Sequence, residues 1–231
     1  MRSKIAFIHG SGYLPNSFDQ QVAAFAGSVA LALPGHPDGD ALESVSDMAR
    51  FVHARLDLER GERAVVGGNS LGGAVSLRWA LEYPRSAQAI ILIGTGARLR
   101  VAPSIFTLIE TRWPACIPEL VDMAISTHAP AWLREQSIRS HECVGQENTR
   151  RDFAACNAFD VMAELDRLQL PALIVVGSDD RMTPPKYSQY LHQHIAGSEL
   201  KVIHEAAHLV MAERPAEVNA AIATFIARVQ S

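Results

Sequence analysis

The sequence predicts an α/β fold built on a mainly parallel sheet, and three observations support this prediction. Short aliphatic runs alternate with segments of helical periodicity along most of the chain. Most of these runs are continuously apolar, as expected for strands that helices cover on both faces. The segments between them are long enough for the crossover helices that parallel strands require. The predicted strands are Ile5–Ile8, Val29–Leu33, Ala64–Val66, Ala89–Ile93, Ala172–Val176 and Leu200–Ile203.

The alternation stops between residues 98 and 166, where we find no strand pattern. An all-helical insertion between two strands is most simply a cap over the strand ends, where open α/β sheets bind ligands. We therefore expect a core of residues 1–97 and 167–231 and a helical cap, or lid, of residues 98–166. The four helical segments expected in the cap are Ile105–Trp113, Ile117–Ile125, Trp132–Ile138 and Arg150–Phe159.

Composition limits the classes of function. The chain has 231 residues, of which 48% are hydrophobic and 20% charged, and its formal net charge is -4. These values favour a soluble globule with a large core over a disordered chain, and they argue against a basic protein that binds nucleic acid or an acidic membrane. No apolar run approaches the roughly 20 residues that span a bilayer, and we identify no export signal.

The cysteines point to a reducing compartment. Cys116, Cys143 and Cys156 are odd in number and lack C-x-x-C spacing. We therefore expect neither a disulfide framework nor a thiolate zinc site, and a cytoplasmic location. Seven histidines also show no shared metal-ligand spacing, so we interpret them as surface or structural residues and expect no metal. They are His36, His53, His128, His141, His192, His194 and His204.

A serine motif follows the third predicted strand. Gly68-Asn69-Ser70-Leu71-Gly72 has the pattern G-x-S-x-G and lies between an apolar strand and a helical segment. Such a strand–turn–helix exposes the serine hydroxyl above the sheet, beside a helix N-terminus whose dipole favours developing negative charge. The simpler alternative is a serine in an ordinary glycine-rich turn or a helix cap, which this context disfavours. We therefore predict Ser70 as a nucleophile.

A glycine-rich turn follows the first predicted strand. In His9-Gly10-Ser11-Gly12 the backbone N–H of Ser11 can face the position above Ser70. Together with the N–H of Leu71 it would form an oxyanion hole, in which each donor stabilises the anion by roughly 3 kcal/mol. An ordinary strand-to-helix loop is the alternative interpretation. We expect His9 to hold this loop through side-chain hydrogen bonds.

A serine nucleophile needs a base, and the base needs an orienting carboxylate. Asp179 and Asp180 follow the strand Ala172–Val176, and His208 follows the strand Leu200–Ile203. All three therefore lie at the carboxyl end of the predicted sheet. The order Ser, Asp, His along the chain is the one expected for this kind of fold.

Together these motifs resemble those of the α/β-hydrolase superfamily, in the branch with a helical cap. The resemblance covers nearly the whole chain, through His9–Gly12, Gly68–Gly72, Gly177–Pro184 and the His208 loop with Glu213-Arg214-Pro215. It implies a carboxylesterase-like serine hydrolase that needs no cofactor. The family's acid lies three residues after the loop glycine, which selects Asp180 over Asp179. Members often have an antiparallel hairpin before the strand that carries His-Gly. Here that strand begins within the first few residues, so we expect a six-stranded sheet without those edge strands.

The expected reaction is hydrolysis of a small, hydrophobic ester through an acyl-enzyme, with Ser70, His208 and Asp180 as the triad. Two other enzymes share the motif: a hydrolase that cleaves C–C bonds in ring-fission products and an enol-lactonase. The former needs cationic groups for a dienoate carboxylate, for which Arg78, Arg98, Arg100 and Arg181 are candidates. A ligand receptor on the same fold is the non-enzyme alternative.

We expect a small-molecule ester as the partner, no nucleic acid or membrane, and a monomer or homodimer. Apolar residues of the cap and catalytic loops should contact the substrate. These are Leu71, Phe106, Trp113, Trp132, Phe159, Met182 and Leu209.

Overall fold

A computed structural model describes residues 4–230 of the chain. Its sheet has six strands in the order β2-β1-β3-β4-β5-β6, and every neighbouring pair is parallel. The prediction of a mainly parallel, six-stranded sheet is confirmed. The strands are β1 (Lys4–Ile8), β2 (Ser28–Leu31), β3 (Ala64–Asn69), β4 (Ala87–Ile93), β5 (Ala172–Gly177) and β6 (Glu199–Ile203).

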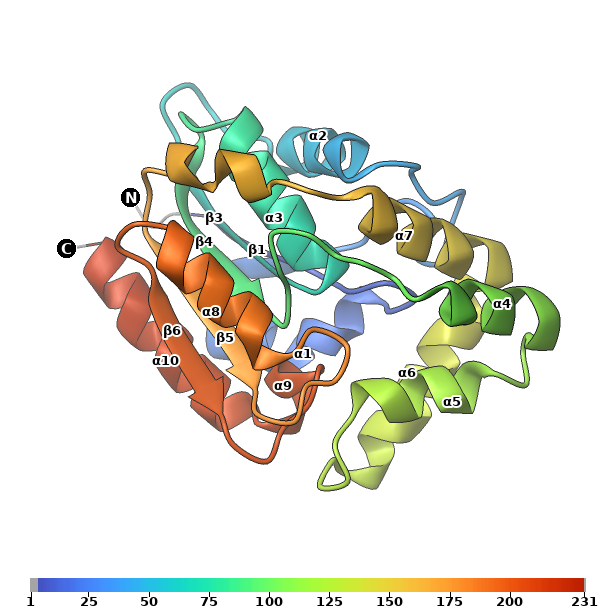
Figure 1. The fold of residues 1–231 in the computed structure, drawn as a ribbon. Helices are drawn as coiled ribbons and strands as arrows, with labels where there is room; N and C mark the ends of the chain where they lie inside the picture. The colour runs from blue at the N-terminus through green and yellow to red at the C-terminus, as the bar shows by residue number, and fades with distance from the viewer. Residues whose placement is uncertain (1–3, 231) are drawn as a thin grey trace.

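Helices cover both faces of the sheet (Figure 1). Along β1, Ala6 and Ile8 belong to the buried core on one face, while Ile5 and Phe7 belong to the core on the other. The first core packs against α2 (Val45–Leu56), α3 (Leu71–Glu82) and α8 (Pro185–His194). The second core packs beside η1 (Pro15–Phe18), α1 (Asp19–Ala24), α9 (Val210–Glu213) and α10 (Pro215–Val229). This double burial explains why the strands are apolar at consecutive positions.

Four helices lie between β4 and β5 and gather on one side of the molecule, away from α10 (Figure 1). Arg98 and Asp160 form an isolated antiparallel bridge where the chain enters and leaves this insertion. The short η2 (Met162–Arg167) then leads back to β5. The four helices are α4 (Pro103–Arg112), α5 (Ile117–Ala124), α6 (Ala131–Val144) and α7 (Gln146–Ala158).

Two of these helices are longer than their apolar patterns indicate. α6 continues to Val144 and α7 begins at Gln146. The sequence pattern misses these extensions because the residues between Ile138 and Arg150 are mostly polar and have no clear apolar period. Gly145, with φ of 82°, separates the two helices. Within residues 4–230, no helix combines the length and the apolar character needed to cross a membrane.

The start of α3 packs unusually close to the end of β1. A Cβ atom added to Gly72 would lie 2.0 Å from the backbone oxygen of Ile8, and one added to Gly68 would lie 2.3 Å from the carbonyl carbon of Gly72. Glycine at these two positions lets strand and helix approach with backbone nearly touching backbone. This contact fixes where the turn between β3 and α3 lies above the sheet.

We predict that Gly72→Ala lowers the free energy of unfolding by about 3 kcal/mol or more, at the top of the range for overpacked sites, because only backbone atoms meet the new methyl group. Gly61→Ala is the matched control, since Gly61 has φ of 90° but open space around its Cβ position. It should cost only the backbone strain of about 1–2 kcal/mol. Urea unfolding of both variants measures the difference, and equal losses would show that the close approach is unimportant.

Candidate active site

Ser70 occupies a strained turn between β3 and α3. Its backbone has φ of 54° and ψ of -112°, a conformation that residues with a Cβ rarely adopt. The Ser70 N–H donates to the carbonyl of Ile93 at 2.9 Å, and the Ser70 carbonyl accepts from the Thr95 hydroxyl at 2.8 Å. These bonds hold the turn to the end of β4, so that the serine is fixed at the carboxyl edge of the sheet.

Asp180 and His208 form a buried pair at the same edge. Asp180 lies in the loop between β5 and α8, His208 lies between β6 and α9, and His208 Nδ1 is 2.9 Å from Asp180 Oδ2. An ionised carboxylate only accepts hydrogen bonds, so Nδ1 carries the proton and Nε2 keeps its lone pair. This tautomer is the one that a general base needs.

Several donors hold the Asp180 carboxylate in place. Its Oδ1 accepts from the backbone N–H groups of Met182 and Thr183 at 2.9 and 2.8 Å, and its Oδ2 accepts from the Thr183 hydroxyl at 2.9 Å. Burial alone would raise the pKa of Asp180, but the interactions of its carboxylate with His208 and Thr183 outweigh burial and lower the pKa. Asp180 therefore stays ionised.

The two neighbouring carboxylates have different surroundings. Asp179 is exposed, and its Oδ1 accepts from the Ser178 hydroxyl at 2.8 Å. Of the two, Asp180 is the one whose hydrogen bond to His208 the structure records. The geometry thus favours Asp180 as the partner of His208.

Asn69 joins the Ser70 turn to the His208 loop. Its side-chain amide donates to the carbonyl of His208 at 2.9 Å and is itself buried. Neither Asn69 nor Thr183 is singled out by the sequence motifs, although both lie inside them, next to Ser70 and Asp180. Both could have been found from the sequence as polar residues that lie beside a catalytic candidate in a glycine- or proline-rich loop.

The turn after β1 lies directly beside Ser70. A Cβ atom added to Gly10 would be 3.5 Å from the Cβ atom of Ser70, and Ser11 and Ser70 line the same two cavities. Among the hydrogen bonds within residues 4–230, none is donated by the backbone N–H of Ser11 or Leu71. Both N–H groups thus have a hydrogen to offer a ligand next to Ser70.

His9 is buried and holds this turn. Its Nε2 accepts from the N–H of Leu33 at 3.2 Å, so its Nδ1 carries the proton and donates to the carbonyl of Gly10 at 3.0 Å. Burial, followed by the charge of His36, lowers the pKa of His9 to about 3. A neutral ring matches both hydrogen bonds.

Two cavities adjoin Ser70. The smaller contains Ser70, His208, Ser11 and Met182 in its wall. The larger has a volume of about 430 Å³, which suits a small ligand. Its wall is mostly apolar, with two guanidinium groups. The lining residues are Ser11, Ser70, Leu99, Arg100, Val101, Ala102, Ile105, Met123, Phe153, Cys156, Arg181, Met182, Thr183 and Tyr187.

The structure corrects most of the predicted substrate contacts. Of the seven predicted contacts, Met182 is the one that lines both cavities. Leu71, Phe159 and Leu209 are instead buried in the two main cores, and Trp132 lies on the surface with 48% of its area exposed. Phe106 and Trp113 pack against the small apolar cluster of Ile109, Cys116, Leu120 and Phe153. None of these six residues is among the described residues that line either cavity. For Phe106, Trp113 and Trp132 the reason is that helix periodicity identifies apolar residues but does not fix how each inserted helix is rotated. Leu71, Phe159 and Leu209 lie in loops or helix ends beside the site, but their side chains turn into the two cores.

Comparison with known proteins identifies the family. The model of the alpha/beta hydrolase family matches residues 5–221, and the chain belongs to that family. It is a hydrolase. Pimeloyl-[acyl-carrier protein] methyl ester esterase of Neisseria meningitidis serogroup C is 28% identical over 89% of this chain and 86% of the relative.

Solved structures give the same fold. A thermophilic esterase is 33% identical, with a TM-score of 0.89 over 97% of this chain and 90% of the other. The enol-lactonase from Burkholderia xenovorans LB400 has a TM-score of 0.88 at 20% identity, over 98% of this chain and 92% of the other. The latter similarity concerns the fold alone.

The geometry of the pair predicts that Asp180→Asn lowers kcat for a p-nitrophenyl ester by about 10³- to 10⁴-fold, because an amide facing Nδ1 favours the wrong tautomer of His208. Asp179→Asn is the matched control and should change kcat by less than about threefold, as expected for an exposed side chain. Steady-state kinetics of both variants, with thermal melts, measure the effect. The reverse order of losses would assign the acid to Asp179.

Proposed function

We propose that the protein is a carboxylesterase-type serine hydrolase with Ser70, His208 and Asp180 as its catalytic triad. The observation that carries this proposal is the buried Asp180–His208 pair, whose histidine lines the same small cavity as Ser70. The esterases among its relatives and structural neighbours support the same reaction.

In the proposed reaction, His208 Nε2 takes the proton of the Ser70 hydroxyl as the serine oxygen attacks the ester carbon. The N–H groups of Ser11 and Leu71 stabilise the negative charge on the former carbonyl oxygen. Asp180 stabilises the imidazolium until His208 returns its proton to the departing alcohol. Water, deprotonated by His208, then cleaves the acyl-enzyme.

The proposed substrate is a small, hydrophobic ester. The apolar wall of the 430 Å³ cavity supports an uncharged acyl or alcohol group of modest size. The reaction as proposed uses neither a cofactor nor a metal. We also propose that residues 98–166 act as a cap over this cavity, since Val101, Ile105, Met123 and Phe153 of that segment line it.

The setting that we propose is the cytoplasm, with the protein as a monomer or homodimer and with no nucleic-acid or membrane partner. Three free thiols support a reducing compartment: Cys116 and Cys156, which are buried, and Cys143, which is exposed. Size-exclusion chromatography coupled to light scattering distinguishes the two oligomeric states.

A second candidate is cleavage of an acidic substrate, either a ring-fission dienoate or an enol lactone. Arg100 and Arg181 line the larger cavity, and neither forms an ion pair within residues 4–230. Arg78 and Arg98, in contrast, pair with Glu164 and Asp160. Assaying p-nitrophenyl esters beside a dienoate and an enol lactone separates these reactions.

The decisive experiment compares wild type with Ser70→Ala. The variant should lose ester hydrolysis by about 10⁴-fold or more while it melts normally, because the triad acts as a unit. A fluorophosphonate should label wild type and not the variant. Ser76→Ala, which removes a buried hydroxyl from the helix that follows Ser70, is the control and should be labelled like wild type. An unlabelled wild type without esterase activity would favour the ligand-receptor alternative.

We predict that Ile105→Ala changes the acyl-chain preference while Phe106→Ala does not. Both residues pack against the same small apolar cluster, but of the two Ile105 is the one that lines the larger cavity. The ratio of kcat/KM for a long over a short p-nitrophenyl ester should shift by about tenfold in Ile105→Ala, which corresponds to a few methylene contacts. Equal ratios in wild type and both variants would remove α4 from the substrate-binding wall.

A further inference from the structure

A second buried acid–histidine pair lies close to Ser11. Asp152 on α7 and His36 in the loop after β2 are both fully buried, and His36 Nε2 is 2.8 Å from Asp152 Oδ2. The same carboxylate oxygen accepts the backbone N–H of Gly12 at 2.9 Å. A single atom of the inserted segment therefore joins two loops of the sheet, one of which carries the proposed oxyanion donor.

His36 is charged in this arrangement. Its Nδ1 lies 3.1 Å from the carbonyl of Pro34, so both ring nitrogens face acceptors and both carry a proton. Burial alone would lower the pKa of His36, but the hydrogen bond and charge of Asp152 outweigh it and raise the pKa. Two other rings lie nearby, and burial lowers the pKa of both His9 and His141. Of the three rings, His36 is therefore the one that pairs with the Asp152 carboxylate.

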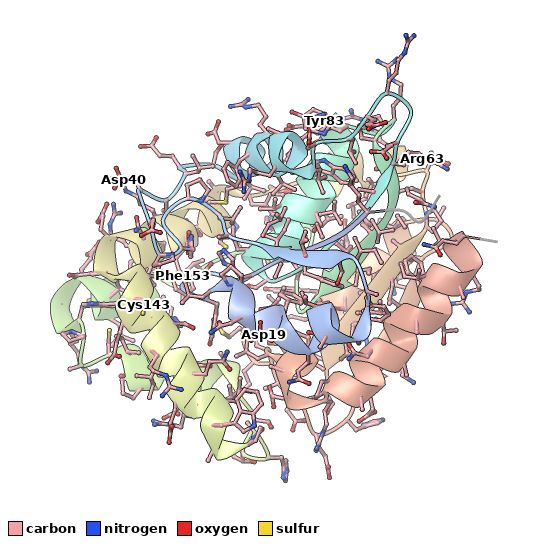
Figure 2. All side chains as sticks on the ribbon, turned by 180° about the vertical axis from the view of Figure 1, so that it is seen from behind. Asp19, Asp40, Arg63, Tyr83, Cys143 and Phe153 are labelled. Carbon is pink, nitrogen blue, oxygen red and sulfur yellow. The ribbon has the colours of Figure 1, made fainter. Side chains whose placement is uncertain are left out.

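The next turn of α7 contacts the same loop. Cys156 Sγ lies 3.4 Å from the hydroxyl of Ser11, and Cys156 and Asp152, four residues apart, share one face of the helix. Burial raises the pKa of Cys156 to about 12, so the thiol is neutral and serves as a weak hydrogen-bonding partner. Figure 2 shows the inserted helices, where Phe153 is labelled, beside the blue N-terminal segment.

Asp152 is a costly residue for a purely structural contact. Its second oxygen, Oδ1, is buried and has no hydrogen-bond partner within the described residues. A buried carboxylate with an unpaired oxygen costs free energy that an apolar residue at this position would avoid. Its other oxygen, Oδ2, accepts the N–H of the peptide group between Ser11 and Gly12.

We propose that Asp152, with His36 as its counter-ion, is a positioning residue for the oxyanion hole, an inference that rests on the proposed function above. By holding the Gly12 N–H, Asp152 fixes the turn and so aims the N–H of Ser11 at the carbonyl oxygen of the substrate. An oxyanion donor acts mainly in the transition state, when the negative charge develops. Misplacing it therefore lowers kcat and leaves KM nearly unchanged.

The test compares Asp152→Asn with a matched control on the same helix. Asparagine keeps the size of the side chain but removes the charge. In Thr149→Val, one turn earlier, a methyl group replaces a buried hydroxyl that has no hydrogen-bond partner among residues 4–230. Each variant is assayed with a p-nitrophenyl ester and with two inhibitors: a trifluoromethyl ketone, to which the Ser70 oxygen adds to give an oxyanion, and the matching unreactive methyl ketone.

In Asp152→Asn we expect kcat and the affinity for the trifluoromethyl ketone to fall together by about 10- to 100-fold. KM and the affinity for the methyl ketone should change by less than about threefold, because neither depends on the oxyanion. Thr149→Val should keep all four values within about twofold, as expected for a change away from the site. A folded Asp152→Asn with wild-type kcat and ketone affinity would overturn the proposal.

His36→Gln provides a second variant, since glutamine still donates a hydrogen bond to Asp152 but carries no charge. If Asp152→Asn does not fold, the same pattern of losses in folded His36→Gln supports the proposal, and wild-type values overturn it. Failure of the proposed function is visible separately in wild type: if Ser70 is not labelled by a fluorophosphonate and no ester is hydrolysed, both proposals fall. If wild type is active but both variants keep its kcat and ketone affinity, only the proposed role of Asp152 is contradicted.

Discussion

The close contact between the start of α3 and the end of β1 sets the position of the whole site. Without side chains at Gly68 and Gly72, the turn between β3 and α3 lies against the backbone of Ile8, and Ser70 takes its strained conformation there. The residues that follow Ile8 then form the turn that carries Ser11, so the serine and the proposed oxyanion donor are neighbours because two backbones touch. Asn69 extends the same arrangement to the loop of His208.

The two acid–histidine pairs show how the same residue types take different states. His208 donates from Nδ1 to Asp180, and within residues 4–230 the hydrogen bonds of its ring all involve Nδ1, so Nε2 remains able to accept a proton. His36 faces acceptors with both nitrogens and therefore has no free lone pair. The first pair has the form of a general base with its orienting acid. The second pair is fully buried. A buried pair of this kind need not stabilise the fold by itself, so its importance lies in the Gly12 N–H that Asp152 also accepts.

The parts of the molecule that the sequence predicts well are those with a local signal. Apolar runs predicted all six strands, and the runs are continuous in the four inner strands because those are buried on both faces. Ser70, Asp180 and His208 could be singled out because each follows a strand in a glycine- or proline-rich loop. Their roles remain predictions, but the hydrogen bond between Asp180 and His208 puts the two side chains where those roles require.

Other features depend on contacts between distant residues and had no local signal. Asp152 lies 140 positions from Gly12 and 116 from His36, and nothing in the pattern of α7 distinguishes it from an exposed helix residue. The cavity wall was misjudged for a related reason. Apolar periodicity in short, proline-separated helices does not determine which face turns inward, so Ile105 and Met123 line the cavity where Phe106 and Trp113 were expected.

Hydrogen bonds join the insertion to the site on two sides, and they limit how far a cap can open. The carbonyl of Ala124, at the end of α5, accepts the backbone N–H of His208 at 3.0 Å, and Glu213 accepts from the N–H groups of both Ser126 and Ala207. On the other side, Asp152 holds Gly12. Swinging the whole insertion away from the sheet would break these bonds, and leaving buried donors without partners costs about 1–3 kcal/mol each. It would also release both the base and the oxyanion turn, so an opened insertion would leave a dismantled site. The inserted helices are therefore part of the framework that holds the reactive groups as well as part of the cavity wall.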